Sequence, residues 1–308
     1  MQITIVGAGG IGGYFGARLI EAGESVSFVA RGAHAAAIRE HGLRVTSALG
    51  DATVRPLAVA EDPAALGVAD LVVFAVKLPD AEPAAAQLKP LLNRQTVVLP
   101  LQNGVDVVDL LARHVGAAAV AAGAALISAR IGGPGVIEHV GPFARLRYGP
   151  LQPPQSERLQ AFHAACQRAR IDAELLADPR RAIWEKFVFL VGMSSLTALT
   201  RQPIGPIREH AEMRRLLRQV MSEAAALARA EGVALDEAFV DAQMAAVDKL
   251  PAGIKASMLG DLLAGKPLEL PWLAGAVVRR GAAHGLEAPA NRFVAAALAP
   301  YVDGAPKT

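Results

Sequence analysis

Cysteine is almost absent from this chain of 308 residues, and its scarcity excludes several kinds of chemistry. The one cysteine, Cys166, permits no internal disulfide and no zinc site built from thiolates. We expect Cys166 to pack in a core. The seven histidines show no spacing typical of metal ligands, so no metal is expected.

Charge of one sign and long apolar runs are also lacking. The formal net charge is only +2, so no broad positive field is available to attract nucleic acid or acidic lipid. The longest apolar runs, 116–129 and 187–200, fall short of the about 20 residues that a membrane-spanning helix needs. The first expected strand begins almost at Met1, which leaves no room for a signal peptide. The sequence therefore predicts a cytoplasmic protein without a nucleic-acid or membrane partner.

Hydrophobic residues make up 53% of the chain, and in the first half they form short continuous runs, typical of strands covered on both faces. The expected strands are residues 2–6, 25–30, 71–76, 96–99 and 120–127. Helical patterns alternate with these strands at residues 11–22, 83–92 and 105–114. This alternation predicts an α/β fold with an N-terminal Rossmann domain, which is a doubly wound parallel sheet.

Three further segments, 53–58, 135–140 and 144–148, are expected to form hairpins at a sheet edge, with Gly141-Pro142 as a turn. From residue 178 onward the pattern predicts an all-helical domain. Its expected helices are residues 180–199, 209–231, 235–247, 257–263, 273–284 and 292–298. We therefore predict a Rossmann domain at 1–177 and a helical domain at 178–308.

A glycine-rich turn follows the first strand directly and opens a helix. Its residues are Gly7-Ala8-Gly9-Gly10-Ile11-Gly12. In this pattern Gly7 permits a tight turn, Gly9 lets the backbone approach a pyrophosphate, and Gly12 lets the helix lie close to the strand. The helix N-terminus then favours the anion. The motif predicts a dinucleotide cofactor.

The end of the second strand indicates which dinucleotide is bound. NAD sites usually place a carboxylate there for the ribose hydroxyls, whereas this strand ends in Arg31 with no acidic residue close behind it. A guanidinium suits a 2′-phosphate, which favours NADP(H). Lys77, after the strand at 71–76, is a second candidate cation. The alternative for Arg31 is a solvated surface arginine.

Two polar residues stand where chemistry could occur. Asn103 follows a strand, and it either contacts a ligand or merely forms a turn with Gly104. Lys186 is a cation within an apolar helix, and spacing of four places Leu190 and Ser194 on its face. A lysine beside a carbonyl could supply a proton to the alkoxide that forms during hydride transfer. Otherwise Lys186 would be an exposed or snorkelling side chain.

Short segments along essentially the whole chain match one family in order and spacing. They are the glycine-rich turn, Arg31, Val76-Lys77, Gln102-Asn103-Gly104, Trp184-Glu185-Lys186, Leu196-Thr197-Ala198-Leu199, Ser257-Met258-Leu259 with Asp261, Glu269, and Arg279-Arg280 with His284-Gly285. The chain thus resembles the 2-dehydropantoate 2-reductase (ketopantoate reductase) family. The resemblance implies NADPH-dependent reduction of 2-dehydropantoate to pantoate, on the route to pantothenate and coenzyme A.

The resemblance also implies residue roles. Lys186 matches the family's proton donor, and Glu269 matches an acidic residue that contacts the cofactor side and orients the substrate hydroxyl. Ser257 matches a hydroxyl that binds the substrate carboxylate. Asn103 matches an asparagine between nicotinamide and substrate, and Ala129 matches a backbone contact to the cofactor.

Five departures from the family pattern concern the substrate pocket. Members active on ketopantoate typically have asparagine where this chain has Leu190, Ser194 and Ile204, and polar residues where it has Pro271 and Ala274. A site without these polar groups should lose discrimination for a polar substrate. The alternatives are therefore a paralogue that reduces a less polar 2-oxo acid, a non-catalytic NADP(H) sensor, and a flavoprotein.

The last expectations concern the roles of the two domains and association. Residues 1–177 are expected to form the NADP-binding domain, and residues 178–308 the substrate and dimerisation domain. Leu216, Val220 and Leu227 form an apolar stripe at helical spacing, which predicts either a core face or the seam of a homodimer.

Overall fold

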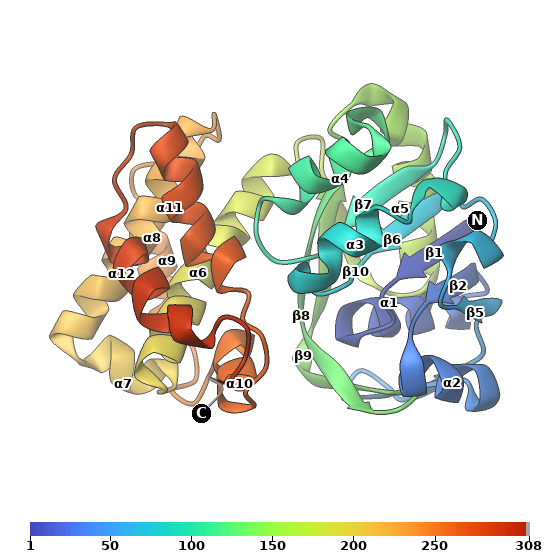
Figure 1. The fold of residues 1–308 in the computed structure, drawn as a ribbon, viewed down its shortest axis with the longest axis horizontal. Helices are drawn as coiled ribbons and strands as arrows, with labels where there is room; N and C mark the ends of the chain where they lie inside the picture. The colour runs from blue at the N-terminus through green and yellow to red at the C-terminus, as the bar shows by residue number, and fades with distance from the viewer. Residues whose placement is uncertain (306–308) are drawn as a thin grey trace. The chain divides into compact units, whose positions relative to one another are not determined.

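The computed structural model describes residues 1–305, which form two compact units (Figure 1). The first unit comprises residues 1–102 and 107–179. The second comprises residues 103–106 together with the chain from Arg180 onward. The main division lies two residues after the boundary expected from the sequence, and the short excursion at 103–106 was not expected. The cofactor and dimerisation roles assigned to the two domains stay predictions.

The first unit contains a parallel sheet, as the sequence predicts. One expected member is wrong, because residues 122–127 of the strand expected at 120–127 lie in a second sheet, and an unpredicted strand at 58–60 stands at the sheet edge instead. The order of the parallel sheet is β5-β2-β1-β6-β7, and every neighbouring pair is parallel. The strands are β1 (Gln2–Val6), β2 (Ser25–Val29), β5 (Ala58–Ala60), β6 (Leu71–Phe74) and β7 (Val97–Pro100). Because β2 and β6 flank β1 on opposite sides, the order reverses there. Ligands of open α/β sheets bind at such a switch point, beyond the carboxyl ends of the strands.

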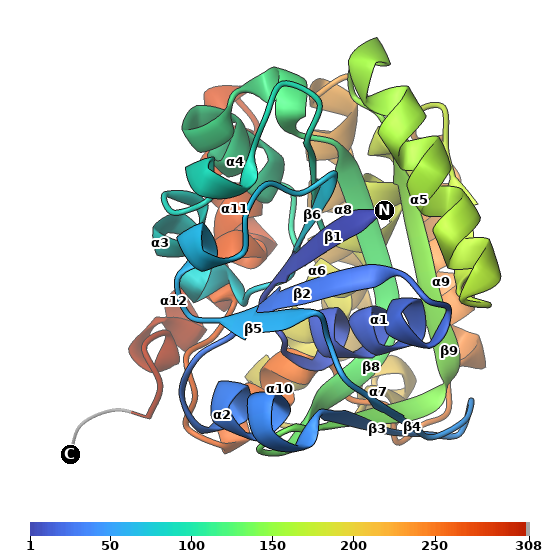
Figure 2. The ribbon, with the colours of Figure 1, turned by 90° about the vertical axis from the view of Figure 1, so that its right-hand side faces the viewer.

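The helices of this unit include α1 (Gly10–Glu21), α2 (Gly32–His41), α3 (Ala81–Ala85), α4 (Val107–Val115) and α5 (Ser156–Arg168). Helix α1 lies between the parallel sheet and a second sheet, since it contacts strands of both (Figure 2). Helix α1 lies close to the parallel sheet because Gly16 has no side chain and leaves room for the Phe28 ring and Ile5. The α/β Rossmann prediction is confirmed.

The second sheet comprises β3 (Leu43–Ser47), β4 (Ala52–Val54), β8 (Ala122–Gly133), β9 (Val136–Gly149) and β10 (Asp172–Leu175). The predicted turn at Gly141-Pro142 is wrong, because β9 runs continuously through it. The turn lies instead at Gly135, whose φ is +73°, between the antiparallel strands β8 and β9. The pairing register skips residues 140–143, so Pro142 lies in a bulge where no ladder bond is required. The expected hairpin at 53–58 is also wrong, since β4 and β5 belong to different sheets.

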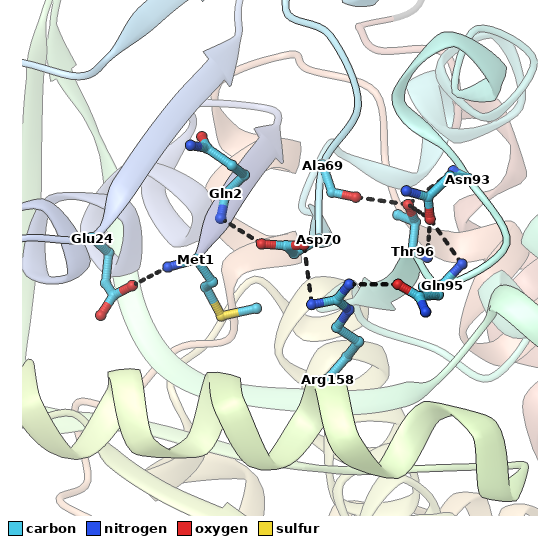
Figure 3. Close-up of polar contacts among 9 residues, drawn as sticks. All are labelled: Met1, Gln2, Glu24, Ala69, Asp70, Asn93, Gln95, Thr96 and Arg158. Carbon is cyan, nitrogen blue, oxygen red and sulfur yellow. Dashed lines mark hydrogen bonds and ion pairs between the residues drawn. The ribbon is translucent and has the colours of Figure 1, made fainter.

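Polar contacts fasten the amino-terminal ends of the strands (Figure 3). The Asp70 carboxylate accepts a hydrogen bond of 2.8 Å from the backbone N–H of Gln2 and lies 3.1 Å from the guanidinium of Arg158. Arg158 also donates to the side-chain oxygen of Gln95 at 3.0 Å. Helix α5, which carries Arg158, is thereby tied to the edge of the sheet opposite the glycine-rich turn.

A second tie at this end involves Glu24. Its carboxylate lies 3.0 Å from the amino group of Met1 and 2.5 Å from the guanidinium of Arg168 (Figure 3 draws the first of these). Burial opposes ionisation of Glu24, but the two cationic partners outweigh burial and lower the pKa of the carboxyl. Cys166 is fully buried in the core of the same unit, as expected.

The second unit is all-helical within the described residues, as predicted. Its helices are α6 (Arg180–Thr200), α7 (Ile204–Glu209), α8 (Ala211–Ala230), α9 (Phe239–Lys249), α10 (Ser257–Leu263), α11 (Ala274–Ala283) and α12 (Pro289–Leu298). The single helix expected at 209–231 is α8 preceded by the end of α7, with the break at His210. Val220 and Leu227 are fully buried and Leu216 packs on the same core, so this stripe is a core face and not a dimer seam.

Helix α6 forms the centre of this unit. It is the one helix among the described residues with the length and composition to cross a membrane, with a mean hydropathy of 1.4 over 18 residues. However, 67% of that window is buried inside the protein, and α6 packs against α8, α10 and α12. These contacts give it the character of a core helix.

Candidate active site

The glycine-rich turn has the backbone shape that its sequence predicts. Gly7 has a φ of +101°, and a Cβ there would lie 2.8 Å from the backbone nitrogen of Val76. At Gly12 a Cβ would lie 2.1 Å from the Gly7 oxygen. By contrast, apart from the two chain neighbours of Gly9, no residue among 1–305 has an atom within 4 Å of the Cβ position of Gly9, the N-cap of α1. The turn is thus tight on its protein side and open at Gly9, where an anion would meet the helix N-terminus.

The turn also rests on strand β8. A Cβ at Gly10 would lie only 2.2 Å from the carbonyl oxygen of Ala129, so the two backbones are in direct contact. Ala129 follows a register shift at residue 128 in the β8–β9 ladder. The bulge turns the strand locally, and bulges of this kind are frequent beside active sites. The structure therefore places Ala129 against the glycine-rich turn.

Two cations and two carboxylates lie around the ends of β2 and β6. Arg31 is exposed, and its guanidinium is 3.5 Å from the carboxylate of Asp80. Lys77 is also exposed and follows β6. Glu61, just after β5, accepts a hydrogen bond of 3.2 Å from the backbone N–H of Gly32, the first residue of α2. The loops after β2, β5 and β6 therefore meet, and together they bring both signs of charge.

Neither carboxylate was predicted from the sequence, because an acidic residue was expected only directly after the second strand. Glu61 follows strand β5, which was not predicted as a parallel strand, and Asp80 follows β6. The signal that could have found them is their place: acidic residues that closely follow parallel strands lie at one edge of the sheet.

Lys186 is on α6 in the second unit, one helical turn before Leu190. Burial lowers the pKa of Lys186 to about 8, and the negative charge of Glu269 partly opposes this shift. An ammonium group with a pKa in this range is a better proton donor than an ordinary surface lysine, yet it is still mostly charged at pH 7. Lys186 is therefore an acid placed in an apolar helix beside a carboxylate.

Glu269 connects Lys186 to Asn103. The Asn103 amide nitrogen donates a hydrogen bond of 3.0 Å to the Glu269 carboxylate, across 166 positions of the sequence. Both side chains are half-buried. The structure thus brings together three of the residues that were expected to take part in the reaction.

An ion-pair network holds the segment that carries Asn103. Asp106 lies 2.5 Å from the guanidinium of Arg279 and 3.1 Å from that of Arg280, both on α11. Arg280 donates two further hydrogen bonds, of 2.6 and 2.7 Å, to Glu231. Residues 103–106 thereby belong to the second unit, although strand β7 of the first unit ends only a few residues earlier, at Pro100.

The predicted substrate residues are placed less uniformly. Leu190 is half-buried on α6, whereas Ser194 is only 1% exposed and its hydroxyl has no hydrogen-bond partner within residues 1–305. Ser257 is exposed at the first position of α10. Ile204 is completely buried in the helical core, so it packs in that core.

Gln102 is a polar residue that the sequence singled out only as part of a motif. It is 6% exposed, and neither polar atom of its side chain has a hydrogen-bond partner in the described part of the chain. Buried side-chain amides normally have hydrogen-bond partners. An amide without one is therefore a candidate for a functional role, such as contact with a ligand. Its place directly before Asn103 is the feature that could have drawn attention to it.

Comparison with known proteins matches both units. Residues 3–153 match the family model described as ketopantoate reductase PanE/ApbA, and residues 178–302 match its C-terminal model. The chain belongs to the ketopantoate reductase family. It is therefore an NADP-dependent oxidoreductase that acts on a CH–OH group.

Relatives with this fold are similar over nearly their whole length. The 2-dehydropantoate 2-reductase of Halobacterium salinarum is 33% identical over 299 residues, covering 96% of this chain and 97% of the relative. The crystal structure of a PanE/ApbA family ketopantoate reductase from Ralstonia eutropha JMP134 is 35% identical, with a TM-score of 0.88 and coverage of 98% and 99%. The 2-dehydropantoate 2-reductase structure from Geobacter metallireducens is 32% identical, with a TM-score of 0.89 and coverage of 97% and 99%.

Proposed function

We propose that this ketopantoate reductase family member reduces 2-dehydropantoate to pantoate with NADPH, with Lys186 as the proton donor. The observation that carries the proposal is the cluster of Lys186, Glu269 and Asn103. Three polar residues from distant parts of the sequence meet there, and the lysine has a pKa lowered to about 8. Pantoate formation would place the enzyme in pantothenate and coenzyme A synthesis, and hence in the cytoplasm.

The residues of the glycine-rich turn fit a dinucleotide. The open space at Gly9, before an α1 N-terminus that lacks a side-chain cap, suits a pyrophosphate, and a Cβ there would intrude on it. Residues 7–12 and the Ala129 backbone would hold the cofactor, which supplies the hydride when bound. Arg31 and Lys77 would bind the 2′-phosphate, so we expect NADPH to be preferred over NADH.

Lys186 would act by donating its proton to the carbonyl oxygen as negative charge develops there. Glu269 has two effects that support this role. Its charge keeps the ammonium form populated, and its hydrogen bond fixes the Asn103 amide. Ser257, at the start of α10, would bind the substrate carboxylate through its hydroxyl. After the transfer Lys186 is neutral and regains a proton from solvent.

A second substrate class is favoured by one feature of α6. Leu190 is the residue one turn beyond Lys186, and the Ser194 hydroxyl is enclosed, so this face offers little to a polar substrate. A bulkier, less polar 2-oxo acid is therefore the second candidate. We also propose a homodimer, although the helix face that first suggested it is internal core.

The decisive experiment follows NADPH oxidation at 340 nm with 2-dehydropantoate beside a panel of 2-oxo acids of increasing apolar bulk. Fast turnover with 2-dehydropantoate is the expected result. Turnover confined to an apolar 2-oxo acid would establish the second candidate. Binding of NADPH without oxidation by any substrate would favour the sensor alternative and remove Lys186 from a catalytic role.

A further inference from the structure

His34 joins the glycine-rich turn to the tip of the β8–β9 hairpin. Its Nε2 lies 2.8 Å from the carbonyl oxygen of Ala8, and its Nδ1 accepts a hydrogen bond of 3.0 Å from the backbone N–H of Gly135. A carbonyl oxygen can only accept, so Nε2 must carry the proton. One neutral tautomer of the imidazole thus satisfies both contacts.

The three partners come from separate segments of the first unit. His34 is the third residue of α2 and is half-buried. Ala8 lies inside the glycine-rich turn and is 3% exposed, and Gly135 is the positive-φ residue of the hairpin. The imidazole therefore bridges two backbone turns, one at residue 8 and one at residue 135, which lie about 130 positions apart in the sequence.

The same hairpin touches the glycine-rich segment at two further points. Gly10 lies against the Ala129 carbonyl, and a Cβ at Gly13 would lie 2.8 Å from the Ile137 side chain. These contacts are steric and leave the orientation of individual peptide groups open. The hydrogen bond from His34 fixes one of them, the peptide between Ala8 and Gly9.

The orientation of this peptide matters for an anion. In a planar trans peptide the C=O of Ala8 and the N–H of Gly9 point in opposite directions. Because the C=O is held toward His34, the N–H is held away from it. Glycine lacks a Cβ and resists rotation of its peptide groups only weakly, so a peptide at Gly9 needs an external contact to stay fixed. A rotated peptide would present its carbonyl oxygen to the pyrophosphate, which is repulsive.

We propose that His34 is a positioning residue for the cofactor, which orients the Ala8–Gly9 peptide so that the turn presents N–H groups to the pyrophosphate. This role rests on the cofactor site proposed above. It predicts a contribution common to NADPH and NADH, because both carry the pyrophosphate. It also predicts no contribution to recognition of the 2′-phosphate.

The test compares His34→Ala and His34→Gln with His41→Ala. His41 is on the same helix and its side chain is 72% exposed, so it is a matched control. Affinities would be measured by titration for NADPH, NADH, ADP-ribose and 2′-AMP. ADP-ribose carries the pyrophosphate without the 2′-phosphate, whereas 2′-AMP carries the 2′-phosphate without the pyrophosphate.

We expect His34→Ala to weaken NADPH, NADH and ADP-ribose by a similar factor, about tenfold, and to leave 2′-AMP unchanged. His34→Gln should restore part of the affinity, since its amide N–H can reach the Ala8 oxygen. His41→Ala should bind all four ligands as the parent protein does. If His34→Ala does not fold, as judged by thermal unfolding, His34→Gln with the same four ligands serves for the comparison.

Two results would overturn the role of His34. Unchanged affinity for ADP-ribose would show that the peptide does not need this hydrogen bond. An equal loss for 2′-AMP would indicate general disorder of the site. Failure of the parent protein to bind NADPH or NADH would instead overturn the proposed cofactor site, and the role of His34 with it.

Discussion

The glycine-rich turn and the Lys186 cluster prepare their chemistry in different ways. In the turn, backbone groups would contact the ligand, and the absence of a side chain at Gly9 leaves space for it. In the cluster, side chains do the work, and their properties depend on neighbours: burial and Glu269 together set the pKa of Lys186. The turn is therefore a local property of a short sequence, whereas the cluster exists only when distant segments meet.

The largest effect should come from removing the acid of the cluster. We expect Lys186→Ala to lower kcat by about two or more orders of magnitude, because general acid catalysis is lost. NADPH affinity should stay nearly constant. Steady-state kinetics and NADPH titration measure the two quantities, and Lys249→Ala, an exposed lysine at the end of α9, is the control. Near-normal turnover of Lys186→Ala would contradict the assignment.

The pH dependence of the parent enzyme sharpens this prediction. Reduction needs protonated Lys186, so the rate should fall as the pH rises through about 8. Replacing Glu269 with Gln removes the charge that favours the ammonium form and should move this fall to lower pH. If the rate falls over the same pH range in both proteins, another group controls the rate.

At the cofactor end, the next largest effect is expected from Arg31. Arg31→Asp should weaken NADPH by about tenfold or more and change NADH little, since only NADPH carries the 2′-phosphate. Arg39→Asp changes the charge equally on α2, the helix for which Arg31 is the N-cap residue, and is the control. Equal losses for both cofactors would mean that Arg31 does not bind the phosphate.

A smaller effect of opposite sign is expected from Glu61. Its carboxylate accepts a hydrogen bond from the backbone N–H of Gly32 and would repel a 2′-phosphate bound nearby. Glu61→Gln keeps an acceptor for that N–H but removes the charge. We expect NADPH to bind a few-fold more tightly, with NADH unaffected, because exposed charges interact weakly in water. Isothermal titration would measure both affinities, and weaker NADPH binding would refute a repulsive role.

The smallest effect concerns stability, at the other end of the sheet. The pKa of Glu24 is lowered in the folded protein, so its contribution is present above the ordinary carboxyl pKa and is lost as the pH falls through the folded value. Glu24→Gln should cost about 1 kcal/mol at neutral pH and much less in acid. Denaturant unfolding at pH 7 and pH 3 would test this, with the exposed Glu40→Gln as control. A cost that is independent of pH would contradict the prediction.

The same contrast explains what could be read from the sequence. Strands β1 and β2 and the glycine-rich turn follow local rules of periodicity and backbone geometry, and helix α10 was predicted with its observed bounds. Helices α2 and α5 and strands β3 and β10 were missed. The two strands are short and the two helices are rich in alanine or charged residues, so contacts with the two sheets decide their conformation.

The site shows the same limit. Arg31 was found because strand ends mark ligand positions, but its partner Asp80 depends on how the loop after β6 folds. The contacts of Arg280 with both Asp106 and Glu231 could not be predicted, because they form only when residues 103–106 pack against helix α11. The hairpin was misplaced because Gly-Pro is a strong turn signal locally, while pairing of β9 with three different strands overrides it.

The excursion at residues 103–106 also bears on modularity. The chain passes between the units three times, after residues 102, 106 and 179. A cut at the main boundary would produce a helical fragment without Asn103 and Asp106, so Glu269 and Arg280 would each lose a partner. The two units therefore cannot be exchanged between relatives as whole modules. A functional chimaera would have to transplant this four-residue segment together with the helical half.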